Sequence, residues 1–143
     1  MPIQRDNPYA NFNFVVEIDG IEVGAFSEVD LPDATIEAIE YRDGSDLSGA
    51  RKLPGRVSYS NVVLKRGLTG RNDLWNWFKA TRDGDLQRRN VAIVLLDEAR
   101  KPVQRWLLQD AWPARFASSD LNARGNEVVI ETLELAYEGF EIE

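Results

Sequence analysis

Acidic and glycine-rich turns are the parts of this sequence most suited to chemistry. The runs DGSD at 43–46 and DGD at 83–85 resemble fragments of calcium-binding loops, but neither has the twelve-residue ligand spacing that ends in glutamate. The run GLTGR at 67–71 precedes a helical pattern, yet it lacks the Gly-Lys-Ser/Thr ending of a phosphate-binding loop. Turn formation and helix capping therefore explain all three runs.

The sequence contains neither histidine nor cysteine. The missing cysteine excludes disulfides and thiolate metal ligands, and the missing histidine removes the commonest general base and transition-metal ligand. Catalysis by paired carboxylates would need converging geometry. A solvated acidic face, or a partner for basic residues, is the simpler interpretation of the C-terminal glutamates. We predict that the protein is not an enzyme and holds no metal or cofactor. The C-terminal glutamates are Glu127, Glu131, Glu134, Glu138, Glu141 and Glu143.

Basic residues cluster on a chain whose formal net charge is −7. Nucleic-acid binding favours a basic balance and aromatic side chains among the basic ones, and Tyr59 is the only such aromatic nearby. Contact with acidic surface on another copy of the chain explains the clusters better. They comprise Arg51, Lys52, Arg56, Lys65, Arg66, Arg88 and Arg89.

The first half of the chain is typical of strands separated by turns. FNFVVEI at 12–18 alternates apolar and polar residues, and Asp19-Gly20 separates it from IEVGAF, which predicts a β-hairpin. ATIEAIEY at 34–41 favours a strand. The segment 42–56 contains three glycines and a proline, so we predict a long loop or projecting arm there, followed by a strand at 57–65.

The second half adds one helix and more strands. Leu74, Trp77, Phe78 and Thr81 recur at helical spacing, which predicts a helix within 69–81 that Thr69 or Asn72 caps. The predicted strands cover 91–97, 103–112 up to Pro113, a short segment near 114–117, and 127–142. The last strand is apolar on both sides, so a second subunit could cover it. The whole pattern favours a β-sandwich or small β-barrel.

Length and hydropathy limit the possible domain organisation of the chain. The 143 residues fit a single domain, 1–143, with no internal repeat or linker. The N-terminus has no apolar core of signal-peptide length, and no segment is long enough to span a membrane. We therefore expect a protein without a membrane anchor that is made and folds in the cytoplasm.

Several motifs, taken together, resemble the tail tube proteins of contractile phage tails and related contractile injection systems. The resemblance covers nearly the whole chain. The motifs are YRDGSD at 41–46, RKLPG at 51–55, NVVLKRGLTG at 61–70, the hairpin at 8–30, LWNWF at 74–78 and the closing strands at 91–113 and 121–141.

The resemblance implies a mainly β fold of two packed antiparallel sheets, as a small barrel or sandwich, with one flanking helix. Six copies would form a ring by joining their sheets, and rings would stack into a hollow tube inside a contractile sheath. The tube would be driven through a target envelope and would conduct DNA or protein cargo. Its partners would be further copies of itself, the sheath, the baseplate and the tube-initiator proteins.

The arm supplies most of the candidate contacts between subunits, because its basic residues can meet acidic residues on another copy. Two alternatives stay open: a secreted ring-forming protein of a type VI-like system, and a small-ligand-binding β-barrel. The candidate contact residues are Arg42, Asp43, Asp46, Arg51, Lys52, Leu53, Arg56, Lys65 and Arg66.

Overall fold

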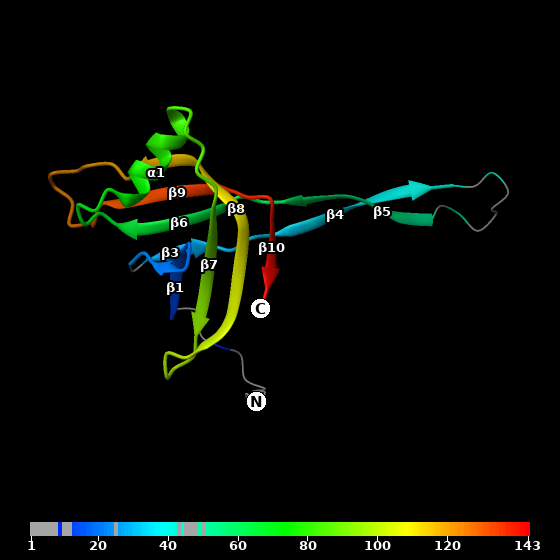
Figure 1. Cartoon of the computed structure of the whole chain (residues 1–143), viewed down its shortest axis with the longest axis horizontal. Helices are drawn as coiled ribbons and strands as arrows, with labels where there is room; N and C mark the ends of the chain where they lie inside the picture. Colours follow the sequence, from blue (N-terminus) through cyan, green and yellow to red (C-terminus); the bar gives the residue numbers. More distant parts are fainter. Residues whose placement is uncertain (1–8, 10–12, 25, 43, 45–48, 50) are drawn as a thin grey trace.

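The computed structural model describes residues 9, 13–24, 26–42, 44, 49 and 51–143. Over these residues the chain forms ten strands and one helix (Figure 1). They are β1 (Phe14–Ile18), β2 (Ile21–Glu22), β3 (Glu28–Asp30), β4 (Ala34–Tyr41), β5 (Arg51–Tyr59), β6 (Val62–Gly67), α1 (Asp73–Arg82), β7 (Arg89–Leu96), β8 (Pro102–Ser118), β9 (Ile130–Ala136) and β10 (Gly139–Ile142).

Two antiparallel sheets share the long strand β8. The first half of β8 lies between β7 and β10, and its second half pairs with β9, which continues to β6 and β3. The path of paired strands ends in β2 and β3, which do not pair with each other in the described chain. The prediction of two packed antiparallel sheets with one flanking helix is confirmed. The sheets form an open sandwich, so the closed-barrel alternative is wrong.

Two predicted strand boundaries are wrong, and both lie near a bend in β8. The predicted strand end at Pro113 is wrong, because β8 continues through it to Ser118; a register shift next to Pro113 accommodates a residue without an N–H. The predicted strand 127–142 is divided into β9 and β10 by Tyr137 and Glu138, which lie opposite the bend. Asp110 adopts a left-handed φ of 53° there, so both strands turn together.

The other predicted elements mostly agree with the structure. The hairpin is confirmed, with Asp19 and Gly20 both at positive φ in a two-residue turn. The strand at 34–41 is β4, and the helix lies at Asp73–Arg82, preceded by Asn72, which makes no capping side-chain hydrogen bond. The prediction of a long loop or projecting arm at 42–56 is corrected in part, because residues 51–56 belong to a strand of a projecting arm, and the single strand predicted at 57–65 is divided between β5 and β6. Residues from Arg51 onward pair with β4, and the chain turns between β5 and β6.

The apolar core lies between the sheets, and α1 closes one end of it. Leu74 and Trp77 of α1 are buried in the core, and the Trp77 indole N–H donates to the Gln87 carbonyl at 2.7 Å. The rings of Trp75 and Phe116 lie 5.4 Å apart, which joins the helix to the second half of β8. The burial pattern of β6 and β9 alternates strictly, so each strand points one row of side chains into this core.

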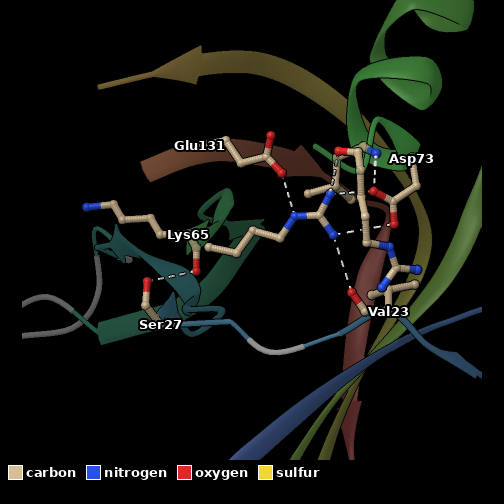
Figure 2. A network of polar contacts seen from close by, with 8 residues as sticks. Val23, Ser27, Lys65, Asp73 and Glu131 are labelled. Carbon is tan, nitrogen blue, oxygen red and sulfur yellow. Dashed lines mark hydrogen bonds and ion pairs between the residues drawn. The ribbon is translucent and has the colours of Figure 1, made fainter. Parts of the chain in front are cut away.

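A buried ionic network holds the strands to the helix (Figure 2). Arg66 of β6 and Glu131 of β9 are only 3% and 4% exposed, and the Arg66 Nε donates to the Glu131 carboxylate at 2.5 Å. The Arg66 guanidinium also pairs with Asp73, the first residue of α1. It further donates to the carbonyls of Val23 at 3.3 Å and of Arg71 at 3.4 Å. One side chain therefore joins β6, β9, the start of α1 and the segment after β2.

This network perturbs the titration of its members. Burial alone would raise the pKa of the Asp73 carboxyl, but hydrogen bonds and the charge of Arg66 outweigh burial and hold that pKa below its usual range. Burial likewise opposes the charged form of Arg66, and its two carboxylate partners nevertheless raise the pKa of its guanidinium. Both groups are therefore ionised in the folded protein at neutral pH.

Removing Arg66 should destabilise the monomer strongly. Arg66→Met leaves Glu131 buried without its partner, and we expect the free energy of unfolding to fall by about 3–5 kcal/mol in urea titrations of dilute protein. The double variant Arg66→Met/Glu131→Met should recover much of that loss. The matched control is Lys65→Met, which breaks an exposed ion pair with Glu28 and should cost less than about 1 kcal/mol. Equal losses in Arg66→Met and Lys65→Met would contradict this role of the network.

Acid should weaken the same network. Because folding lowers the pKa of Asp73, its contribution to stability is present above the unfolded pKa of about 3.9 and is lost as the pH falls through the lower folded value. Urea titrations from pH 7 to pH 2 should therefore show a shallower acid loss in Asp73→Asn than in the unmodified protein. Parallel curves for the two proteins would show that Asp73 makes no such contribution.

Candidate functional site

A two-stranded arm projects from the sandwich (Figure 1). It consists of β4 and β5, which within the described residues pair only with each other. Described residues of both strands are exposed throughout, except for the half-buried Gly55. An isolated two-stranded hairpin is marginally stable in water. The arm is therefore the part of the described chain that most clearly requires a partner surface.

The arm holds most of the predicted contact residues. Arg42, Arg51, Lys52, Leu53 and Arg56 are all exposed there. Asp43 and Asp46 lie outside the described residues. The structure thus brings the basic residues of the arm onto one projecting element, as the sequence suggests.

Lys65 and Arg66 are placed differently from the rest of that set. Both belong to β6 in the body, where Lys65 forms an ion pair with Glu28 at 3.4 Å. The expectation that Arg66 lies at a surface contact is wrong, because its guanidinium is buried and forms hydrogen bonds within the chain. Arg66 alternates along β6 with the half-buried Lys65 and Gly67, so its side chain points into the core beside Glu131.

The base of the arm is anchored by an aromatic cluster. The ring centroids of Tyr59, Tyr137 and Phe140 lie 5.8–6.3 Å apart. The Tyr137 hydroxyl donates to the Ser60 carbonyl at 2.7 Å, and Ser60 and Asp33 exchange two hydrogen bonds across the two strands. Burial, together with the nearby Asp33 carboxylate and Tyr59, raises the pKa of Tyr137 to about 12, so its hydroxyl remains a donor. The arm therefore leaves the body in a defined direction.

Exposed apolar side chains form two patches along the arm. The inner patch is Ile36, Val57 and Tyr59, close to the body, and the outer patch is Ile39, Tyr41 and Leu53, close to the tip. These side chains are 39–58% exposed. Sequence reasoning recognised the strand at 34–41 and named Leu53 as a contact, but it missed the patches because it assigned 51–56 to a loop. The register Ile36↔Val57 and Ile39↔Leu53 brings each patch together.

A second uncovered apolar surface lies at the open end of the sandwich. This cleft has a volume of about 550 Å³ and is lined by Phe14, Phe26, Leu31, Leu95, Trp106 and neighbouring residues of β3 and β7. Two of its polar residues already have partners, since the Ser27 hydroxyl donates to the Lys65 carbonyl and Glu28 pairs with the Lys65 amine. A small-ligand pocket needs convergent polar groups that are free to orient the ligand. An apolar protein surface suits this cleft better.

Other kinds of site find no support in the described residues. In that part of the chain, no group of three or more acidic side chains is arranged to hold a metal ion. Nor is the described helix long and apolar enough to cross a membrane.

Three solved structures contain chains that are similar to this one. The chain is 29% identical to a chain of the anti-feeding prophage (AFP) baseplate, 6-fold symmetrised, with a TM-score of 0.86 over 97% of both chains. It is 25% identical to a chain of the AFP tube-terminating cap, with a TM-score of 0.88 over 100% of this chain and 95% of that one. A chain of the PVC sheath–tube complex, an extracellular contractile injection system in its extended state, shares the fold at 22% identity, with a TM-score of 0.87 over 96% and 93%.

The type VI alternative has weaker support. Hcp1 from Flavobacterium johnsoniae is 11% identical, with a TM-score of 0.59 over 92% of this chain and 94% of that one, which shows a shared fold alone. A search of curated protein sequences returned no match. Residues 10–141, however, match the family described as T4-like virus tail tube protein gp19. Because that match covers almost the whole chain, this protein belongs to the T4-like virus tail tube protein family.

Proposed function

We propose that six copies of this chain form a ring and that rings stack into the hollow inner tube of a contractile tail or injection system. The observation that carries the proposal is the arm, a projecting element whose apolar side chains have no cover in the single chain. Large uncovered apolar surface marks an interaction site. The related AFP chain comes from a 6-fold symmetrised assembly, which supports a ring of six.

Open strand edges supply the second means of joining copies. In the described chain, β3 pairs only with β6, and β10 pairs only with β8. An unpaired edge offers its N–H and C=O groups to another strand, and a closed ring satisfies every such edge. Pairing of this kind uses the main chain, so a subunit can assemble without any special reactive side chain.

The basic residues of the arm give these contacts their register. Arg42, Lys52 and Arg56 are exposed on the arm, while the whole chain is acidic, with a formal net charge of −7. Acidic surface on another copy therefore attracts the arm. Such charge complementarity speeds encounter and selects orientation more than it adds affinity. Asp43 and Asp46 belong to the same proposed contact, as do Arg51, Leu53 and Lys65.

The assembled tube requires further partners. Related chains come from baseplate, cap and sheath–tube structures, and we infer that this chain likewise contacts a sheath, a baseplate and a tube initiator. The tube is assembled in the bacterial cytoplasm and becomes part of a virion tail or injection particle. Sheath contraction drives it through a target envelope, and DNA or protein cargo passes along its bore. The subunit has a structural role without catalysis.

Reversing charge on the arm should impair tube growth. In Arg51→Glu/Lys52→Glu, like charges meet at the proposed contact, and we expect a loss of tube growth in which the critical concentration for growth rises by about tenfold or more, equivalent to at least about 1.4 kcal/mol per added subunit. Sedimentation and negative-stain electron microscopy measure this loss, and urea titration checks that the monomer still folds. The charge-conserving Arg51→Lys/Lys52→Arg should still form tubes. Tubes of normal length from the charge-reversed variant would show that these residues make no contact between copies.

A further inference from the structure

We infer that the Arg66 side chain couples the cleft at the open end of the sandwich to the start of α1, so that covering the cleft orders the first turn of the helix. This inference rests on the proposed function, in which a neighbouring copy covers the cleft. It gives the free and the assembled subunit different helix starts. The observations that carry it are the contacts that Arg66 makes in both directions (Figure 2).

One wall of the cleft is the segment 26–31, which includes β3, and the opposite wall includes Leu95 of β7 and Trp106 of β8. Strand β3 pairs with β6, and its other edge has no partner strand in the described chain. That open edge borders the cleft, because Glu28 and Val29 of β3 belong to the cleft lining. A copy that pairs with this edge is therefore also placed against the cleft.

This wall is attached to the body through two adjacent residues of β6. The Ser27 N–H and hydroxyl both donate to the Lys65 carbonyl, at 2.8 and 3.1 Å. The Arg66 guanidinium donates to the Val23 carbonyl at 3.3 Å and lies 5.8 Å from the centre of the Phe26 ring. Phe26 lines the cleft and also belongs to the buried core. A displacement of the wall therefore displaces groups that contact Arg66.

The start of α1 depends on the same guanidinium. The side chain of Asn72, before the first turn, makes no capping hydrogen bond. The Asp73 carboxylate instead accepts from the Leu74 N–H at 3.0 Å and pairs with Arg66. Arg66 also donates to the Arg71 carbonyl at 3.4 Å. Because the first N–H groups of a helix have no partners within the helix, their order depends on such contacts.

Burial makes Arg66 a stiff link between the two regions. It is only 3% exposed, and the Glu131 carboxylate holds its Nε at 2.5 Å. A buried guanidinium that loses one partner finds no water to replace it, so each contact favours a single arrangement of the others. Coupling between two sites is reciprocal. Covering the cleft should thus order the start of α1, and loosening the start of α1 should weaken assembly.

Hydrogen exchange tests the first half of this statement. In the unmodified protein, the amides of residues 74–77 should exchange at least about fivefold more slowly in tubes than in dilute subunits. Asp73→Ala removes the link to Arg66 but keeps a residue that favours helix, and it should lose most of this difference. The matched control is Asp83→Ala at the other end of α1, where the exposed carboxylate pairs with Arg82, and it should keep the difference.

A double-mutant cycle on tube growth tests the reciprocal half. Leu31→Ala alters the wall of the cleft, and Asp73→Ala alters the start of α1. The critical concentration for growth, measured by sedimentation, should rise in each single variant. In the double variant the rise should be at least about threefold smaller than the product of the two single rises, because coupled sites are not additive. The control pair Leu31→Ala/Asp83→Ala should give the full product.

Three outcomes would overturn the coupling while leaving the tube function intact. They are equal slowing of exchange in Asp73→Ala, an unchanged critical concentration in that variant, and a full product in Leu31→Ala/Asp73→Ala. Circular dichroism and urea titration of dilute subunits check that every variant is folded. If Asp73→Ala forms no tubes at any concentration, the milder Asp73→Asn takes its place in both measurements. Failure of the unmodified protein to form tubes would instead count against the proposed function.

Discussion

The bend of β8 is the constraint on which the rest of this structure depends. One strand serves both sheets, so its turn at Asp110 sets how the sheets cross. The segment that pairs with β8 must turn at the same place. Tyr137 and Glu138 therefore interrupt it and separate β9 from β10. Tyr137 then holds the base of the arm through the Ser60 carbonyl. The direction of the arm is therefore a consequence of the way the two sheets share a strand.

Two sheets that share one strand leave the sandwich with two open ends, and this chain treats the ends differently. At the end where β7 begins, α1 fills the opening with Leu74 and Trp77, and Arg66 fastens the start of the helix to β6 and β9. A buried ion pair of this kind contributes little net stability but tolerates few alternative arrangements. At the other end the cleft beside Leu95 and Trp106 remains open. In the described chain, the helix thus closes one end of the core and the cleft leaves the other end uncovered.

Sequence patterns predicted the elements that depend on local chemistry. The Asp19-Gly20 turn, the period of α1 and the β-branched run of β7 are encoded by adjacent residues, and all three are found in the structure. The errors occur where pairing with a distant strand determines the local structure. Pro113 suggests an end, yet a register shift beside it lets β8 continue, and the glycines and Pro54 suggest a loop where β5 pairs with β4. The burial of Arg66 likewise depends on Glu131 and Asp73, which are distant or on another element.

The arm shows how one added residue changes the meaning of an apolar pattern. Read as an alternating strand, residues 34–41 have no single apolar face, because Ile36 and Ile39 are an odd number of residues apart. In a water-exposed hairpin this would be a defect. The bulge in β5 makes it consistent, since it supplies each isoleucine with an apolar partner on its own face. Such a bulge interrupts regular pairing within the arm, and it leaves exposed apolar side chains on both faces. The described chain covers neither face, so each of the two faces is a surface suited to contact with another molecule.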